Sequence, residues 1–485
     1  MSLKAILMWR FIDEKLLEFK GCFNRQAAFK WFVIVVIGLM IRTDHLGVTS
    51  IIRALGINPH FYESIIHFFH ASSWKLETIR RKWLDVVMGS GLVYRVCDKP
   101  LLIGDGVKET KEGRKIPCVK KLVQESENSS KPQFMHGHMF GAIGILLGNA
   151  DKLFCTLLSV RLHDGNDVVG MWAKDEYANE SHVVRIIRES CEIAANIGAS
   201  ILTLDRYYLT VPALTALIEE SKKHGKTLLG IVTKAKKNAV AYEKPTPKSG
   251  RGRPPVKGAS VKLMSLFTSC ADRFQETSVT IYGKQETVEF FTINLLWGQK
   301  LYQELKFVLV KIGSTKSILV STDLTLSPKA IIEIYSLRFK VECSFREFKQ
   351  VIAGFAYRFW TSAMPKLNRF AKNCVMNAAL SAITDINDKA SIVRTWRAIE
   401  GFTMFAVIAF GIIQMTALRF GKAIGDSNFR WLRTKRNDIP SEATTVDFMR
   451  KTIFNRFYFS PDLVIARLID KTAIPSEESR CSLDA

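Results

Sequence analysis

The strongest constraint on the fold is a run of alternating strand-like and helix-like segments between Leu101 and Val232. Three apolar runs of strand length come first, and two of them are joined by the hairpin-like turn Gly148-Asn149-Ala150-Asp151. Two segments with helical spacing of apolar residues then alternate with two further apolar runs. This order predicts a mixed α/β sheet, and its segments are residues 101–105, 141–147, 153–162, 181–198, 199–204, 211–224 and 227–232.

Both ends of the chain have helical spacing of apolar residues. We therefore expect a helical region first, then a core in two parts around a basic loop and β-rich insertion. A helical carboxy-terminal region and a disordered polar tail would follow. The expected bounds, in chain order, are 1–98, 99–235, 236–303, 304–365, 366–475 and 476–485.

Three short helices are expected before the core. A helix over residues 48–55, a turn with Gly56 and a helix that starts near Pro59 have the form of a helix-turn-helix. A third helix, capped by Ser72 or Ser73, would follow. Its basic residues include Lys75, Arg80 and Arg81. Helix pairs with a glycine turn are common, so a DNA-binding unit and an ordinary helical domain are both open.

The charge of the chain favours a polyanionic partner. Lys and Arg number 69 against 46 Asp and Glu, a formal net charge of +23, and nucleic acid is the commonest polyanion. A basic protein without such a partner, or one lying on an anionic membrane, is the alternative. The apolar runs 32–40 and 402–418 are too short or too interrupted to span a bilayer, so we expect buried helices and no membrane segment. Nine scattered cysteines without a C-x-x-C pair fit a reducing, cytoplasmic location.

Residues 234–262 are rich in Lys, Arg, Pro and Gly. The segment is either a solvated linker or a DNA-tracking loop in which Arg251 and Arg253 contact the backbone or minor groove. Alternation from Ser265 to Thr292 predicts inserted antiparallel strands, and strands over 305–310 and 317–321 precede a long helix from about Ser327.

Two acids, Asp105 and Asp205, are expected at strand ends, where side chains from neighbouring strands converge. Convergent carboxylates are the ligands that Mg²⁺ prefers, and two metals can stabilise both oxygens of a phosphoryl transfer. The alternative is that each Asp simply forms a turn.

The motif Tyr335-x2-Arg338-x3-Glu342-x6-Lys349 falls within the predicted long helix. Offsets of three and four residues return to one helix face, so these side chains form a stripe. A ladder of surface ion pairs around Glu342 would have the same pattern.

The stripe resembles the Y-R-E-K signature of bacterial insertion-sequence transposases of the DDE type. Asp105 and Asp205 precede it in the order of that family, and the segments Ser321-Thr322-Asp323-Leu324 and Tyr357-Arg358-Phe359-Trp360 are similar too. The family often has Asp-Arg-Gly-aromatic at its second acid, whereas this chain has Asp205-Arg206-Tyr207-Tyr208.

The resemblance implies an RNase H-like catalytic core in which Asp105, Asp205 and Glu342 bind two Mg²⁺ or Mn²⁺ ions. It also implies that Tyr335, Arg338 and Lys349 contact phosphates of the element end. Trp297 resembles an aromatic that stacks on a flipped base in some relatives, although packing in the core would explain it equally.

The expected function is cut-and-paste transposition, with cleavage at terminal inverted repeats and transfer of the 3′-hydroxyl to target double-stranded DNA. A homodimer on DNA and a nucleoid-associated bacterial location would follow. The alternatives are a DNA-binding protein derived from a transposase but without catalysis, and an RNase H-like nuclease without strand transfer.

Overall fold

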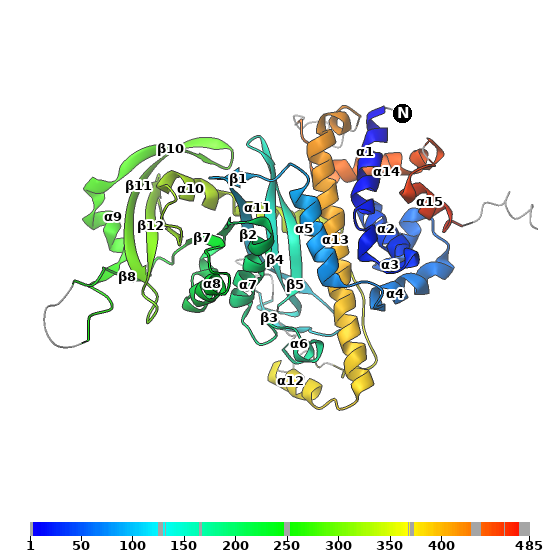
Figure 1. Ribbon diagram of the computed structural model, residues 1–485, viewed down its shortest axis with the longest axis horizontal. Coiled ribbons are helices and arrows are strands. Elements are labelled where there is room, and N and C mark those ends of the chain that lie inside the picture. Colours follow the sequence, from blue (N-terminus) through cyan, green and yellow to red (C-terminus); the bar gives the residue numbers. More distant parts are fainter. Residues whose placement is uncertain are drawn as a thin grey trace, which may run out of the picture.

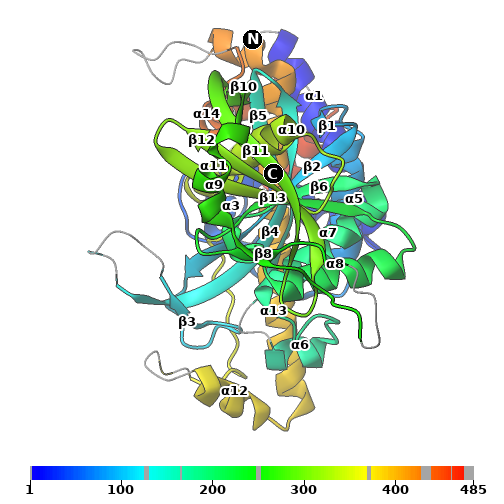
Figure 2. The ribbon, with the colours of Figure 1, turned by 90° about the vertical axis from the view of Figure 1, so that its left-hand side faces the viewer.

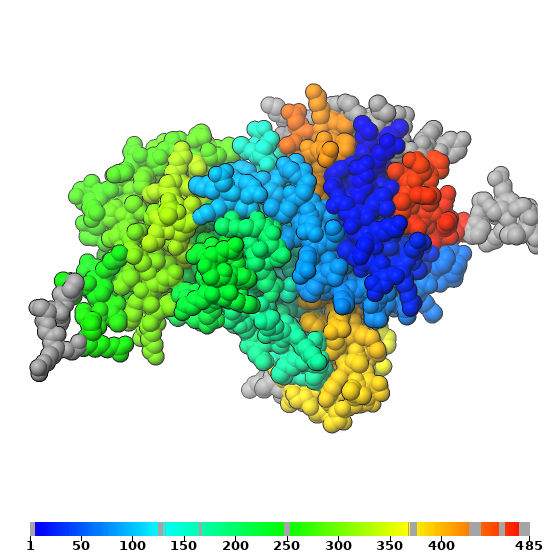
Figure 3. Space-filling model, viewed as in Figure 1, coloured from blue at the N-terminus to red at the C-terminus, as the bar shows by residue number. Residues whose placement is uncertain are grey.

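The computed structural model describes residues 3–124, 130, 132–163, 167–246, 253–366, 368, 373–427, 438–459 and 461–474. Arg251 and the expected tail, 476–485, lie outside the described residues. Within the described part, thirteen strands form one sheet with helices at both ends of the chain (Figure 1). A β-rich lobe lies at one end of the molecule and a helical body at the other (Figure 1). The first residues of the chain, in blue, and its last described residues, in red, lie together on the helical body (Figure 3).

The middle of the sheet follows the predicted order of segments. Its antiparallel strands are β1 (Arg95–Val96), β2 (Lys99–Thr110), β3 (Lys120–Val123), β4 (Phe134–Asn149) and β5 (Lys152–Leu162). Then come α6 (Asp167–Ala173), α7 (His182–Ile197), β6 (Ser200–Thr203), α8 (Val211–Lys223) and β7 (Leu229–Lys234). β6 pairs in parallel with β2 and with β7, which gives the spatial order β5-β4-β2-β6-β7. This mixed sheet is consistent with an RNase H-like core.

Local signals predicted several of these elements correctly. The hairpin between β4 and β5 is confirmed, and Asn149 accepts a hydrogen bond from the backbone of Asp151 (3.1 Å) in its turn. Ser181 caps α7 by accepting from Val184 N–H, and Thr210 caps α8 by accepting from Ala213 N–H.

β2 is longer than predicted, which corrects the position of its acid. The strand ends at Thr110, so Asp105 lies in its middle and not at its end. The reason is that β4 is also long and pairs with β2 as far as Thr110. Pairing with β4 thus keeps the polar residues after Asp105 in the strand, and the alternation of apolar and polar residues within β2 does not reveal this pairing.

The insertion extends the same sheet. Its strands are β8 (Val240–Tyr242), β9 (Ser260–Lys262), β10 (Gln275–Ile281), β11 (Lys284–Trp297), β12 (Gln303–Ile312) and β13 (Thr315–Ser321), and β13 pairs with β7. The expectation of strands from Ser265 is wrong for its first part, because Leu263–Ser265, α9 (Leu266–Ser269) and Ala271–Arg273 are helical turns. Leu263, Leu266 and Phe267 on these turns are buried in a separate core of the insertion, so tertiary packing overrides the local pattern.

The predicted long helix is divided in two. α10 (Pro328–Ser336) and α11 (Phe339–Gln350) are separated by Leu337 and Arg338, whose N–H groups bond to carbonyls only three residues back. The backbone stays in the right-handed helical region there, so the axis changes at a tightened turn and not at a loop.

The two helical ends of the chain form one body. Its members are α1 (Leu3–Leu17), α2 (Gln26–Ile41), α3 (Val48–Leu55), α4 (Tyr62–His70), α5 (Leu76–Met88), α13 (Ile386–Ser427), α14 (Glu442–Phe459) and α15 (Val464–Asp470). α12 (Asn373–Ser381) instead packs on α6 and β3. α13 contacts β5 of the sheet as well as α1, α2, α4 and α5, so it lies between the sheet and the first helices (Figure 1). Seen from the side, it runs along the sheet for most of the molecule's height (Figure 2).

The predicted helix-turn-helix is present as α3, a left-handed Gly56 and α4. The predicted cap of the third helix is wrong: Lys75 is the N-cap of α5, and its side chain makes no capping bond.

α13 is the one described helix long and apolar enough to cross a membrane. In its most apolar window 94% of the residues are buried inside the protein, and the predicted buried run 402–418 belongs to it. The other run, 32–40, is buried within α2. Core helices of this kind pass the same length and hydropathy test.

Candidate active site

Asp105 on β2 and Asp205 just after the parallel neighbour β6 occupy equivalent places. In the ladder between β2 and β6, Ile103 is paired with Thr203, and each acid follows two residues later. Residues two apart on a strand point to the same side, and neighbouring strands lie about 4.8 Å apart. The parallel register therefore brings these two acids together.

α11 carries Glu342 to the same place. Ser344 fixes the helix against β5 by donating to the carbonyl of Cys155 (2.6 Å), and Phe345 and Phe348 are buried beneath it. Arg338 joins the acids: Nη1 lies 3.3 Å from Oδ2 of Asp105, and Nη2 pairs with Oε1 of Glu342.

The electrostatics of Asp105 reflect this crowding. Burial raises its pKa to about 6, and the charges of Asp205 and Glu342 add to the rise, while the Gly106 N–H and Arg338 oppose it. Burial works to lower the pKa of Arg338, but the three carboxylates outweigh it and raise that pKa. Three acids from β2, the β6 end and α11 thus surround one guanidinium.

The other two residues of the predicted stripe lie on either side of this cluster. Burial raises the pKa of Tyr335, at the end of α10, to about 12, and Arg338 opposes the rise. Nζ of Lys349 lies 3.0 Å from Oε2 of Glu109 and donates to the carbonyl of Lys108 (2.9 Å). Lys349 therefore lies beside β2, whereas Tyr335 lies near Arg338 and Asp205.

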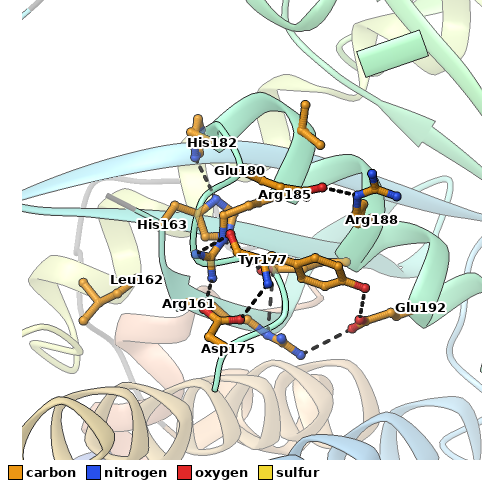
Figure 4. A network of polar contacts seen from close by, with 12 residues as sticks. Arg161, Leu162, His163, Asp175, Tyr177, Glu180, His182, Arg185, Arg188 and Glu192 are labelled. Carbon is orange, nitrogen blue, oxygen red and sulfur yellow. Dashed lines mark hydrogen bonds and ion pairs between the residues drawn. The ribbon is translucent and has the colours of Figure 1, made fainter. Parts of the chain in front are cut away.

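A chain of buried polar groups lies behind the acids, and the sequence reasoning missed it. The hydroxyl of Tyr208, three residues after Asp205, lies 2.7 Å from Nε2 of His182. Nδ1 of His182 in turn lies 2.8 Å from Nδ1 of His163 (Figure 4). His163 then reaches Glu189 (3.0 Å), which also faces Arg161 and Arg185. Burial lowers the pKa of His182 to about 3, so this imidazole is neutral.

Two glycines give this network its space. A Cβ on Gly106 would lie 2.8 Å from Nε2 of His182, and one on Gly141 would lie 1.9 Å from Cε1 of His163. The pattern Gly104-Asp105-Gly106 in an apolar run was the signal that a second group passes close to the acid-bearing strand.

The predicted contacts in the insertion lie apart from the acid cluster in the sequence and the sheet. Trp297 ends β11, is half-buried and packs on the insertion core, which supports the packing interpretation. Arg253 is exposed in the connection between β8 and β9.

The predicted basic residues near α5 divide into two groups. Lys75 and Arg81 are exposed, so both can meet a ligand. Arg80 is only 8% exposed and pairs with Glu77 and with Glu400 of α13 (3.2 Å). The expectation that Arg80 contacts DNA is therefore wrong, because the helix turns this residue towards α13.

The chemistry of the donors fits a hard divalent cation. Three carboxylates would supply oxygen ligands. Burial, with a smaller part from the charges of Asp205 and Glu342, raises the pKa of Asp105, and a bound cation would offset both effects. Among the described residues, no three acidic, histidine or cysteine side chains are already grouped as metal ligands, and Arg338 supplies the positive charge between them. A metal would hence take over the role of this guanidinium.

A mixed sheet with converging carboxylates defines the class of phosphoryl-transfer enzymes that work on phosphodiesters. A family model described as DDE superfamily endonuclease matches residues 18–284, more than half of the chain. The chain belongs to this family, and its function is of the nuclease or transposase type. The match includes Asp105 and Asp205 and ends before Glu342. No curated protein and no solved structure matches the chain.

Proposed function

We propose that this protein is a DNA transposase of the Y-R-E-K group, which cleaves phosphodiesters at the ends of a mobile element and joins the 3′-hydroxyl to target DNA. The observation that carries the proposal is the convergence of Asp105, Asp205 and Glu342 on Arg338 from three separate elements. A surface ladder of ion pairs would not require two of its acids to lie in register on neighbouring core strands.

In this proposal Asp105, Asp205 and Glu342 hold one or two Mg²⁺ or Mn²⁺ ions. Such ions, when bound, acidify water and stabilise the attacking and leaving oxygens of an in-line displacement. The chain's own residues orient the DNA. If metal ions neutralised the acids, Arg338 would be free to pair with a phosphate. A guanidinium suits this role because its N–H groups bind two phosphate oxygens at once.

Tyr335 and Lys349 complete the phosphate contacts on either side of Arg338. In cleavage, water attacks the phosphorus, the P–O3′ bond breaks, and the products are a 3′-hydroxyl and a 5′-phosphate. In joining, the oxygen of that hydroxyl attacks a phosphorus of target DNA, the target's own P–O3′ bond breaks, and a 3′-hydroxyl of the target is released. The exposed Lys75, Arg81 and Arg253 are proposed to hold the backbone of double-stranded DNA away from the cleaved bond. Both inverted repeats must be present together, so a homodimer assembles on DNA.

The first test is cleavage of duplex DNA that carries the element's flanking ends, in Mg²⁺ or Mn²⁺. Asp205→Asn and Glu342→Gln are expected to bind this DNA and to cut at least about a hundredfold more slowly, as for loss of a group that stabilises charge in the transition state. The control is Glu347→Gln, which removes an acid of the same helix that pairs with Arg346 and stands outside the cluster.

Cutting by both variants at the wild-type rate would exclude this metal site. Binding without cutting by the wild-type chain would favour the non-catalytic DNA-binding protein. Cutting without joining, in an assay that includes a target duplex, would favour a nuclease without strand transfer.

A further inference from the structure

A basic cavity of about 890 Å³ opens beside the acid cluster. Its floor and rim come from β2 and the residues after it, and from the segment after α11. The Lys and Arg side chains that line it are Lys111, Arg114, Lys115, Lys349, Arg358 and Lys366, against two acids, Glu109 and Glu112. The aromatic side chains Phe355, Tyr357 and Trp360 line it as well.

The cavity lies near the proposed active site, on the same strand and the same helix. Glu109 lies four residues beyond Asp105 on β2, about 13 Å along a strand. Lys349 lies seven residues beyond Glu342 on α11, about 10 Å along a helix. The ion pair of Glu109 with Lys349 marks the border between the two sites.

Two of the lining cations, Lys111 and Lys115, stabilise the fold by bonding to backbone carbonyls. Nζ of Lys111 donates to the carbonyl of Phe355 (2.5 Å) and lies 3.7 Å from the ring centre of Tyr357, and Lys115 donates to the carbonyl of Ser362. Burial, with the charges of Arg358 and Lys349, lowers the pKa of Lys111 to about 8, while the charge of Glu109 opposes the shift. Among the described lining residues, six Lys and Arg side chains face two acids, so positive charge is in excess at this place.

Other lining cations point to solvent. Arg114, Arg358 and Lys366 are exposed, and in the described part of the chain none of them forms an ion pair. Three exposed cations at a cavity lined by more cations than acids are suited to an anionic ligand.

Trp360 shows what kind of anion fits. In residues 357–360 the side chains alternate: Tyr357 and Phe359 are buried against Phe402, while Arg358 and Trp360 face outwards. Trp360 is 63% exposed, an unusual state for the largest apolar side chain. An exposed indole next to unpaired cations is the combination that binds single-stranded nucleic acid, because any base can stack on the ring while the cations hold the phosphates.

We infer that this cavity binds single-stranded DNA next to the cleaved bond, with a base stacked on Trp360 and phosphates on Arg114, Arg358 and Lys366. The inference rests on the proposed function, since it assigns the cavity to the strand that the acid cluster cuts.

The test measures affinity, by fluorescence anisotropy of the full-length protein, for oligothymidine, for a blunt duplex and for the same duplex with a single-stranded overhang. Trp360→Ala is expected to weaken binding of oligothymidine and of the overhang duplex about tenfold, the usual effect of losing one stacked base, and Trp360→Phe to restore most of it. Binding of the blunt duplex should change less than about twofold.

A second pair of variants tests the cations. Arg114→Ala and Arg358→Ala should each reduce the slope of log affinity against log salt by about 0.7 for oligothymidine. The matched controls lie outside the cavity: Phe454→Ala removes an aromatic that is 52% exposed on α14, and Lys226→Ala removes an exposed cation after α8.

Equal losses on blunt duplex and oligothymidine would overturn the single-strand assignment, as would wild-type affinity in both Trp360→Ala and Arg358→Ala. Failure of this inference is distinguishable from failure of the proposed function. In the first case the wild-type chain still cuts element ends, and in the second it cuts none of the duplexes, whatever its affinity for single strands.

Discussion

At the scale of single residues, the acid cluster is an unfavourable arrangement that the fold imposes. Asp105 has a pKa of about 6 in the folded chain although Arg338 is beside it. Its pKa in the unfolded chain is near 3.9. The folded state therefore binds the proton more tightly, and the charged form of Asp105 weakens the fold at neutral pH.

Asp105→Asn is accordingly expected to stabilise the metal-free protein by about 1 to 2 kcal/mol at pH 8, since one pKa unit corresponds to about 1.4 kcal/mol and the site keeps some solvent. The gain should shrink as the pH falls from about 6 towards 4, where the wild-type side chain also becomes neutral. Urea unfolding at several pH values in the presence of a chelator measures it.

Asp323 provides a control with the opposite sign. Burial works to raise its pKa, but the hydrogen bond and charge of Lys99 (2.7 Å) together with Thr325 lower it. Asp323→Asn should thus destabilise the fold above the pH at which a free Asp ionises, and the loss should vanish in acid. A loss of stability in Asp105→Asn at pH 8 would contradict the argument that the charged form of Asp105 weakens the fold.

At the scale of elements, β2 and β4 leave no room beside them. Gly141 of β4 faces His163, and the sequence distance between them hides this contact. Because interiors are close-packed, a methyl group here displaces the imidazole and breaks its bonds to His182 and Glu189.

Gly141→Ala is expected to destabilise the protein by about 3 kcal/mol, at the upper end of overpacking effects. The double variant with His163→Ala should recover part of the loss, because the added methyl then has space. Gly21→Ala, where no atom lies within 4 Å of the new Cβ, serves as the control and should be almost neutral. Chemical denaturation of the three variants would refute the steric argument if the double variant were the least stable.

At the scale of the whole molecule, the helical ends are one structural unit. α13 is buried between β5 and the first helices, and Arg80 of α5 pairs with Glu400 of α13. Without the first helices, a large apolar face of α13 would meet water. The amino-terminal helices therefore cover the core as well as carrying the exposed Lys75 and Arg81.

A chain that begins at Lys99 is therefore expected to lose cooperative unfolding and to aggregate, since exposed apolar patches of this size associate. Thermal unfolding and size-exclusion chromatography of the shortened chain measure this. A monomer with a sharp unfolding transition would show that the first helices form an independent domain.

The sequence by itself determined the features that are local. Caps such as Ser181 and Thr210, the hairpin before Asp151 and the order of strands and helices follow from hydrogen bonding and periodicity within a few residues. The acids were also visible, because the chemistry of Asp105, Asp205 and Glu342 shows in residue type and spacing.

Only the tertiary structure decided which groups meet. The length of β2 depends on its pairing with β4, the inward turn of Arg80 depends on Glu400, and Trp297 packs on an insertion core that no local pattern reveals. The cavity with Trp360 combines β2 with a segment far along the chain. Contacts between distant segments depend on how the sheet and the helices pack around α13. The periodicity of apolar residues within one segment carries no information about that packing.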